Sequence, residues 1–227
     1  MENKTTYIHR MFSSIAGTYD PLNTILSFNM DGYWRRFTVS KLDPEGSELA
    51  LDVATGTGKL ALELAKKFGE GGKVVGIDYC EAMLRKAKKR KNIEYLPAIS
   101  ENLPFSDSTF DYATIGFGLR NVTDLEKTLR EMTRVIKPEG KVACLEFSLP
   151  RGRLFQKLHH IYLFKVMPFI GGLISGNKEA YNYFPRSIEE FLEPEELKQI
   201  MEGVGLKDVQ FHPLTWGIVT VHLGTKT

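Results

Sequence analysis

The sequence predicts an α/β fold with a mostly parallel, seven-stranded sheet and an antiparallel hairpin at the C-terminal edge. From about residue 48, short β-branched runs alternate with segments of helical periodicity, which is the pattern of βαβ units. A glycine-rich turn follows the first of these runs. The chain ends in two adjacent strand-like segments, and such a pair favours an antiparallel hairpin beside parallel strands.

The strands are predicted from short apolar, β-branched runs, and the helices from apolar residues that share one face. The first helix places Ala61, Leu64, Ala65 and Phe68 on one face, and a second helix is expected over residues 81–91. The strands are expected at residues 48–54, 73–78, 93–99, 110–115, 141–147, 207–214 and 217–224.

A further helix is marked by Thr123 and Glu126, which have the spacing of a capping box, and its apolar face extends to Ile136. Residues 137–140 are expected to end this helix before the fifth strand. The basic run 85–91 is interpreted as a solvated helix face, with attraction to anionic lipid as the alternative and nucleic acid as a weaker one.

Two segments lie outside the strand–helix alternation. We expect both over the carboxyl ends of the strands, where open α/β sheets bind ligands. The sequence thus predicts one domain over residues 1–227, in which residues 1–45 form an N-terminal helical cap. Residues 149–190 form an insertion that faces the substrate or a membrane, although an amphipathic helix packed on the sheet is an equally good interpretation.

Composition excludes several classes of protein. Apolar residues make up 42% of the chain, enough for a sizeable core, and the net charge of +2 argues against a dedicated nucleic-acid binder. Cys80 and Cys144 form no metal-binding or disulfide pattern. The N-terminus lacks the features of an export signal, and the stretch 161–174 is expected to be too short and too interrupted to span a bilayer. We therefore expect a cytoplasmic protein without a metal.

The turn Gly56-x-Gly58-x-x-Ala61 formally satisfies the dinucleotide fingerprint, and Asp78 follows Gly58 by 20 residues. Glycines let the backbone approach a ligand, and an acid at the end of the second strand can accept hydrogen bonds from ribose hydroxyls. The alternative is an ordinary tight turn with Asp78 as a helix N-cap. Taken alone, the motif is weak.

The run Leu51-Asp52-Val53-Ala54-Thr55-Gly56-Thr57-Gly58 resembles motif I of the class I S-adenosylmethionine-dependent methyltransferases. A carboxylate at this turn disfavours a pyrophosphate and favours an ammonium or sulfonium, so S-adenosylmethionine is preferred over NAD. Residues 100–105, 110–111 and 134–141 are similar to later segments of the same class. The resemblance implies a Rossmann-like class I methyltransferase fold. It also implies cofactor contacts at Asp52, Gly56, Thr57, Gly58, Asp78, Tyr79, Ile99, Ser100 and Gly116.

The flanking segments narrow the resemblance. Residues 19–23 resemble the YDxMN signature of the demethylmenaquinone and ubiquinone C-methyltransferase family, and residues 27–28 and 34–37 resemble its SxGxHRxWK signature. Residues 117–124 match its FGLRNVxD motif, 145–148 its LEFS motif, and 214–224 its ending. The chain departs from the family at residues 29–32, which read Asn-Met-Asp-Gly where the family usually has Gly-x-His-Arg. It also has Leu22 for Met and Glu139 for Gly.

The resemblance implies transfer of a methyl group to a ring carbon of a reduced, prenylated quinone, with demethylmenaquinol expected as the substrate. A hydroquinone carbon is a poor nucleophile, so a base or a base-linked water is expected. Arg120 could stabilise the phenolate, because its pKa is too high for a base. The residues expected to act are Tyr19, Arg120 and Asn121 in catalysis, and Asp20, Asn23, Asp31 and Trp34 in substrate binding.

Several alternatives stay open at this point. Arg120 could pair with a surface acid, and Asn121 could simply end a strand. His159 and His160 are interpreted as surface or packing residues. The acceptor could be a benzoquinol of the ubiquinone pathway, another lipophilic phenol or a small metabolite. A cofactor-binding subunit without turnover and a dehydrogenase are the remaining interpretations. Expected partners are a prenylated quinol, the inner face of a membrane as a peripheral contact, and a second copy in a homodimer.

Overall fold

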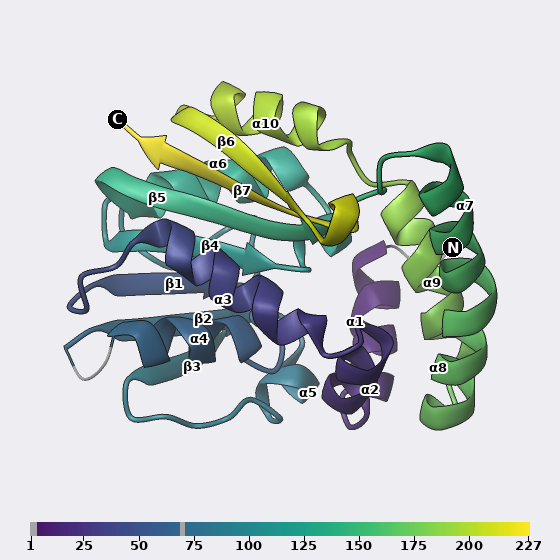
Figure 1. Ribbon diagram of the computed structural model, residues 1–227. Helices are drawn as coiled ribbons and strands as arrows, with labels where there is room; N and C mark the ends of the chain where they lie inside the picture. Colours follow the sequence, from purple (N-terminus) through teal and green to yellow (C-terminus); the bar gives the residue numbers. More distant parts are fainter. Residues whose placement is uncertain (1–3, 69–70) are drawn as a thin grey trace.

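The predicted sheet is confirmed by the computed structural model, which describes residues 4–68 and 71–227 (Figure 1). In this part of the chain, seven strands form one sheet in the order β3-β2-β1-β4-β5-β7-β6. β7 runs antiparallel to both of its neighbours, and the other neighbouring pairs are parallel. The strands are β1 (Leu49–Val53), β2 (Lys73–Asp78), β3 (Ile93–Pro97), β4 (Phe110–Gly116), β5 (Ile136–Phe147), β6 (Leu206–Leu214) and β7 (Val219–Lys226).

Helices cover both faces of the sheet because successive strand residues point to opposite sides. In β1, Ala50 packs against α3 and α4, whereas Leu51 and Val53 pack in the cluster that contains α6 and α10. All three side chains are fully buried. The covering helices are α3 (Met30–Leu42), α4 (Lys59–Phe68), α6 (Leu125–Val135) and α10 (Pro194–Gly203).

A second group of helices gathers at the carboxyl ends of the strands (Figure 1). It combines α1 and α2 from the N-terminal segment with the helices of the insertion, and their buried side chains form a core of their own. α3 does not belong to this group, since it lies along the face of the sheet. The group consists of α1 (Lys4–Ile15), α2 (Tyr19–Leu26), α7 (Arg153–Ile161), the π-helical turn η2 (Tyr162–Val166), α8 (Met167–Ser175) and α9 (Lys178–Glu189).

The stretch 161–174, which was expected to be too short to span a bilayer, belongs to a longer helix in the structure. α7, η2 and α8 join into one helical run, Arg153–Ser175, whose 23 residues are long and apolar enough to cross a membrane. One side of this run is buried at Leu163 and Met167, where it packs against α2 and α9. Length and composition therefore do not separate a spanning helix from a surface helix here.

Several predicted element boundaries are wrong. The helix expected over 81–91 is only α5 (Glu81–Leu84), because the basic run that follows supplies no apolar face to bury and its like charges repel. Residues 85 and 86 and residues 88–91 are exposed, which fits a solvated segment but not a helix.

The α6 cap and the start of β5 also differ. Asp124 caps α6 by accepting a 2.9 Å hydrogen bond from the Lys127 N–H, so Thr123 forms no capping box. β5 begins directly at Ile136, and its early residues pair across a bulge with β4. Glu139 adopts a left-handed φ of 63° there, a backbone conformation that favours glycine.

The strand order fixes where a ligand can bind. β1 and β4 are neighbours in the sheet, but their following connections lead to opposite sides, to β2 and to β5. The carboxyl ends of such a pair form the crevice in which open α/β sheets bind ligands. In this chain the second group of helices stands above that crevice (Figure 1).

Candidate functional site

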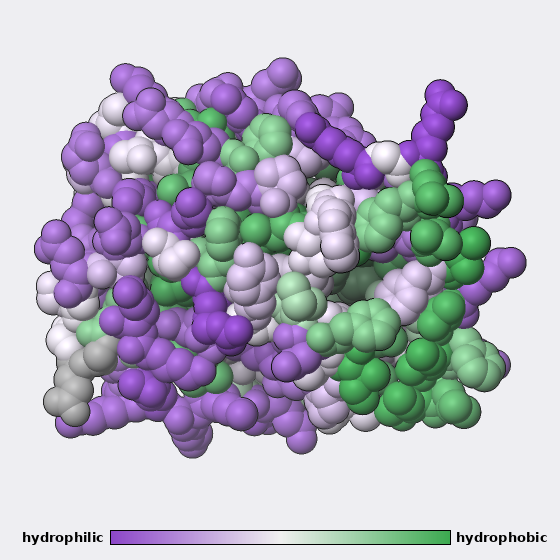
Figure 2. Space-filling model, viewed as in Figure 1, coloured by the Kyte–Doolittle hydropathy of each residue, from purple (hydrophilic) through white to green (hydrophobic). Residues whose placement is uncertain are grey.

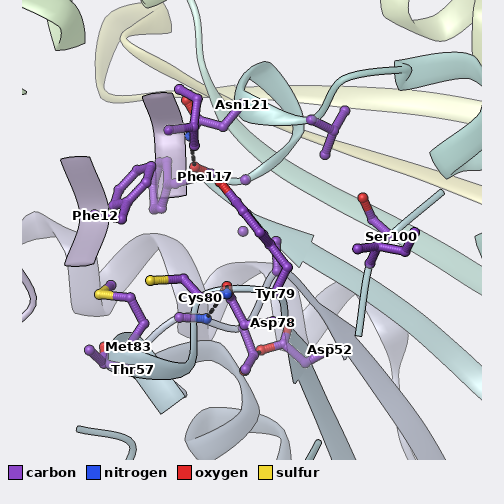
Figure 3. Close-up of a pocket in the computed structure, with 18 of the residues that line it drawn as sticks. Phe12, Asp52, Thr57, Asp78, Tyr79, Cys80, Met83, Ser100, Phe117 and Asn121 are labelled. Carbon is purple, nitrogen blue, oxygen red and sulfur yellow. Dashed lines mark hydrogen bonds between the residues drawn. The ribbon is translucent and has the colours of Figure 1, made fainter. Parts of the chain in front are cut away.

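A pocket lies at this crevice, and we call it the polar pocket (Figure 3). Its walls are the turn 54–57 after β1, residues 78–80 after β2, the loop 98–101 and residues 116–118 after β4. Eight of the nine predicted cofactor residues line it, namely Asp52, Gly56, Thr57, Asp78, Tyr79, Ile99, Ser100 and Gly116.

The ninth, Gly58, is absent from the described lining and has a different reason to be glycine. Its φ of 76° is left-handed, and a Cβ at this position would lie 2.1 Å from the Tyr95 hydroxyl oxygen. Gly58 also donates its N–H to the Thr55 carbonyl, 2.9 Å away. The glycine therefore permits a tight turn packed against β3.

Asp52 is a buried carboxylate that the described residues surround with uncharged donors. It accepts hydrogen bonds from the Thr55 hydroxyl (2.6 Å), the Thr114 hydroxyl (2.7 Å) and the Ala61 N–H (3.2 Å). Burial raises the pKa of Asp52 to about 6, although these hydrogen bonds act in the opposite direction. A cationic ligand in the polar pocket would favour the ionised form.

Asp78 shapes the glycine turn as well as facing the pocket. One carboxylate oxygen accepts the Gly56 N–H and the other accepts the Cys80 N–H, each at 2.8 Å. Burial raises the pKa of Asp78 above its usual range. Cys80, not Asp78, is the N-cap residue of α5, so the helix-cap interpretation of Asp78 is wrong. Each carboxylate oxygen keeps a lone pair for a further donor.

α1 covers the polar pocket. Ile8 and Phe12 line it, and Figure 3 shows Phe12 above the turn that carries Asp78. At the N-terminal end of this helix, Lys4 Nζ donates to the Val122 carbonyl at 2.8 Å. The sequence predicts a helical cap here but does not identify these residues, because an amphipathic helix does not reveal what its apolar face covers.

A second pocket lies beside the first, and we call it the apolar pocket. Its volume of about 730 Å³ falls within the range of about 300–1,000 Å³ typical of small-molecule sites. Its wall is mainly aromatic and aliphatic, from α2, α3, β5 and the helices of the insertion. Three of the four predicted substrate residues line it, namely Asn23, Asp31 and Trp34.

Three residues line both pockets and mark the boundary between them: Tyr19, Arg35 and Phe117. Arg35 lies over the Phe117 ring at 5.3 Å. Burial raises the pKa of the Tyr19 hydroxyl, although Arg120 and Arg35 act to lower it. Tyr19 therefore stays protonated at neutral pH and can donate a hydrogen bond at this boundary.

Arg120 lines the apolar pocket and forms a buried ion pair. Its Nη1 donates to Glu146 Oε1 at 2.6 Å and to the Phe117 carbonyl at 2.8 Å, and its Nε donates to the Ser187 hydroxyl at 3.2 Å. Both charged side chains are at most 3% exposed. The predicted alternative of a surface acid is thus wrong, because the partner is a buried strand residue. No described residue forms a hydrogen bond with Nη2.

Asn121 lies in the short 3-10 helix η1 (Leu119–Asn121), not at the end of a strand. Its Nδ2 donates to the Phe117 carbonyl at 3.3 Å, and its Oδ1 accepts from the Tyr183 hydroxyl at 3.0 Å. The side chain lines the polar pocket (Figure 3). The Oδ1 contact therefore joins η1 to α9, while the Nδ2 contact stays within the segment that leads into η1.

The carboxylates of α2 and α3 are connected to the glycine turn. Asp31 accepts from Arg35 Nη1 and Lys59 Nζ, each at 2.9 Å, while Asp20 accepts from the Thr57 hydroxyl at 2.7 Å. Burial acts to raise the pKa of Asp31, but the hydrogen bond from Lys59 and the charge of Arg35 bring it below its usual range. Asp20 is absent from the described lining of both pockets.

Sequence reasoning missed three charged residues of the site: Arg35, Lys59 and Glu146. Lys59 begins α4, where a cation is unfavourable, and Glu146 interrupts an apolar strand. Both features were visible signals that a partner was needed. Arg35 gave no such signal. Of the two interpretations of His159 as a surface or a packing residue, the structure supports packing, because the side chain is buried on the wall of the apolar pocket.

Comparisons with known proteins identify the family of this chain. A model of the ubiE/COQ5 methyltransferase family matches residues 1–226. The chain belongs to this family. It is 45% identical to the ubiquinone/menaquinone biosynthesis C-methyltransferase UbiE of Geotalea daltonii over 235 residues, covering 100% of this chain and 99% of that protein. It is also 40% identical to the demethylmenaquinone methyltransferase of Bacillus cereus strain B4264, covering 99% and 98%.

The fold is that of class I methyltransferases, as predicted. The crystal structure of an S-adenosylmethionine-dependent methyltransferase from Thermotoga maritima superposes with a TM-score of 0.68, covering 97% of this chain and 100% of that one. The two sequences are 24% identical, so this likeness shows the fold alone. The family membership makes this chain a methyltransferase and implies use of S-adenosylmethionine.

The Arg120–Glu146 pair gives a stability prediction. We expect Arg120→Ala to lower the free energy of unfolding by about 3–5 kcal/mol, because it leaves a buried carboxylate without its partner. The double variant Arg120→Met, Glu146→Leu should recover most of this loss, since neither charge is then buried. Urea denaturation measures both effects.

The matched control is Arg85→Ala, which breaks an exposed pair with Glu81. It should cost no more than about 1 kcal/mol. Equal losses in Arg120→Ala and Arg85→Ala would show that burial of the Arg120 pair carries no energetic weight.

Proposed function

We propose that this chain transfers the methyl group of S-adenosylmethionine to a ring carbon of a reduced, prenylated quinone, with demethylmenaquinol as the substrate. The observation that carries the proposal is the pair of adjoining pockets. A polar pocket with buried carboxylates meets an apolar pocket of about 730 Å³ at Tyr19, Arg35 and Phe117. The names of the curated relatives support a quinone as the acceptor.

The polar pocket suits S-adenosylmethionine because of its charges. No described basic side chain is hydrogen-bonded to Asp52, whose donors are two hydroxyls and one N–H. The ammonium of a bound amino acid group would balance this buried charge, while Asp78 would accept from the ribose hydroxyls. When bound, S-adenosylmethionine supplies a methyl group activated by its sulfonium. Asp52, Gly56, Asp78 and Ser100 would hold it.

The apolar pocket suits a hydrophobic ring and tail. The rings of Phe117, Phe147 and Phe184 stand in sequence along its wall, with centroid separations of 4.5 Å and 5.2 Å. Trp34 is fixed there because its Nε1 donates to the Thr215 hydroxyl at 2.8 Å. Such an apolar, well-packed wall can align a quinol carbon with the methyl donor, and alignment of this kind lowers barriers by up to about 7–11 kcal/mol.

Arg120 and Tyr19 would stabilise the negative charge that develops on the quinol oxygen. Arg120 has its Nη2 left for a ligand, and Phe147 and Phe184 flank its guanidinium at 5.3 Å and 5.0 Å. The Tyr19 hydroxyl is kept protonated by burial, so it serves as a donor and not as the base. Asn121 acts indirectly by holding the Phe117 carbonyl and Tyr183.

The quinol proton needs an acceptor on the pocket wall. Among the described lining residues, Asp31 and His159 offer one. Asp31 is ionised at neutral pH because its basic partners lower its pKa. Burial and the neighbouring His160 lower the pKa of His159, which leaves a neutral imidazole with a free lone pair. We infer that one of these two groups takes the proton.

The expected membrane contact and the expected homodimer stay predictions. We infer a cytoplasmic enzyme that meets its quinol at the inner face of the membrane, since a prenylated substrate resides there. A homodimer is also kept as a prediction from the sequence.

The proposed activity is tested with labelled S-adenosylmethionine and chemically reduced demethylmenaquinone. We expect label in the naphthoquinol, and a demethylated benzoquinol in a parallel assay tests dual use. Cofactor binding without transfer to either quinol would contradict the quinone acceptor and favour another lipophilic phenol.

The raised pKa of Asp52 predicts pH-dependent cofactor binding. A bound ammonium favours the carboxylate, so affinity should be full above about pH 6 and fall as the pH drops below it. The expected loss approaches tenfold per pH unit between the pKa values of the free and bound states. Calorimetric titration with S-adenosylhomocysteine between pH 4.5 and 8 measures it.

Asp52→Asn is the control for this titration. It should bind weakly at every pH and show no such dependence between pH 5 and 7. A wild-type affinity that is constant over this range would contradict the assigned role of Asp52.

Tyr19→Phe removes one donor at the boundary of the pockets. We expect kcat for methyl transfer to fall about 10²- to 10³-fold with little change in KM, as when an oxyanion-hole donor is lost. Tyr112→Phe, on β4 and outside the described lining of both pockets, should leave kcat unchanged. Equal kcat values for the two variants would exclude Tyr19 from the chemistry.

A further inference from the structure

An exposed apolar surface covers the outer side of the helical run Arg153–Ser175. We call it the α7–α8 face, and it is formed by Leu154, Leu158, Ile161, Phe169 and Leu173. Leu154 and Leu173 are each 75% exposed and Phe169 is 72% exposed. Figure 2 shows hydrophobic side chains gathered at this end of the molecule, whereas the rest of the visible surface is mainly hydrophilic. A monomer in water rarely exposes such a contiguous patch without a partner.

The segment that carries the α7–α8 face has charges of one sign, and the acids at its border, Glu189 and Glu195, come from elsewhere in the chain, where they pair with His160 and Arg151. Residues 149–178 contain no Asp or Glu. The same stretch carries five basic side chains, which are exposed: Arg151, Arg153, Lys157, Lys165 and Lys178. An apolar face bordered by cations matches the surface of an anionic bilayer, which presents acyl chains beneath negative headgroups.

The apolar pocket opens onto this same end of the protein. Leu158 belongs to the α7–α8 face and also lines the pocket. Phe28 and Trp216 likewise line the pocket and are 77% and 78% exposed. Phe155 on α7 contacts the Trp216 ring, with centroids 5.5 Å apart. The side chains at the rim of the pocket are thus continuous with the exposed patch.

We propose that the α7–α8 face docks on an anionic phospholipid bilayer, with the rim of the apolar pocket turned towards the acyl chains. The helical run lies in the plane of the interface, because its inner side is buried at Leu163 and Met167 against the protein. Lys157 and Lys165 are exposed residues within the helical run, and their long side chains reach the headgroups. A hydrophobic tail then enters the pocket from the bilayer without crossing water.

The role of this docking in substrate delivery rests on the proposed function. The bilayer contact itself needs neither quinol nor cofactor. It is tested by sedimentation of the full chain with vesicles of phosphatidylcholine containing 30% phosphatidylglycerol, and with pure phosphatidylcholine vesicles. We expect binding to the anionic vesicles and much weaker binding to the neutral ones.

Two variants separate the apolar and the charged contributions. The double variant Phe169→Ser, Leu173→Ser should abolish sedimentation, because it removes apolar contacts with the acyl chains. It should still fold, since both side chains are exposed. Lys157→Gln, Lys165→Gln should weaken binding to anionic vesicles roughly 30-fold, on the basis of about 1 kcal/mol for each basic residue at the surface. The matched control is Lys88→Gln, Lys89→Gln, which removes two exposed charges from the basic run near β3 and should bind like the wild type.

Several outcomes would overturn the docking proposal. Wild-type protein that fails to sediment with anionic vesicles contradicts it, as does equal binding by Phe169→Ser, Leu173→Ser. A dimer in light scattering that this variant dissociates would show that a second copy covers the face instead. Methyl transfer to a short-tailed, water-soluble quinol should be unchanged in the variant. If that transfer is absent in the wild type while vesicle binding persists, only the proposed function fails.

Discussion

The buried ion pair of Arg120 and Glu146 is the interaction on which the arrangement of the two pockets depends. It connects η1, which follows β4, to the end of β5, and Arg120 also reaches Ser187 on α9. The sheet is thereby joined to the helices of the insertion at the point where the pockets adjoin. A buried pair of this kind contributes little net stability, but each charge requires the other. The ion pair matters for the site because of its position, since the guanidinium of Arg120 also lines the apolar pocket.

A second set of charges joins the N-terminal helices to the glycine turn. Thr57 and Lys59, at the start of α4, contact Asp20 and Asp31 on α2 and α3. This explains why two predicted substrate residues are engaged with the protein itself. The carboxylate of Asp31, which is 6% exposed, is matched by two cations, Arg35 and Lys59.

The two pockets differ in how much of them the sequence could reveal. The polar pocket is built from loops that directly follow strands, so a local motif such as the glycine turn identifies its residues. The apolar pocket is built from segments far apart in the chain, such as Tyr19, Phe147 and Trp216. No local pattern indicates that these side chains meet. Similarly, a helix is expected over residues 81–91, but the basic run 85–91 lacks an apolar face that could stabilise one beyond Leu84.

The sequence by itself determined the α/β architecture, the antiparallel hairpin, the family and the position of the glycine turn, because each depends on short-range periodicity or on contiguous motifs. Only the tertiary structure decided that Glu146 is the partner of Arg120, that His159 faces a pocket, and that Tyr19 lies between both pockets. These relations arise when the insertion packs against α1 and α2 above the carboxyl ends of the strands. Burial and long-range pairing are properties of that packing, and a linear pattern does not contain them.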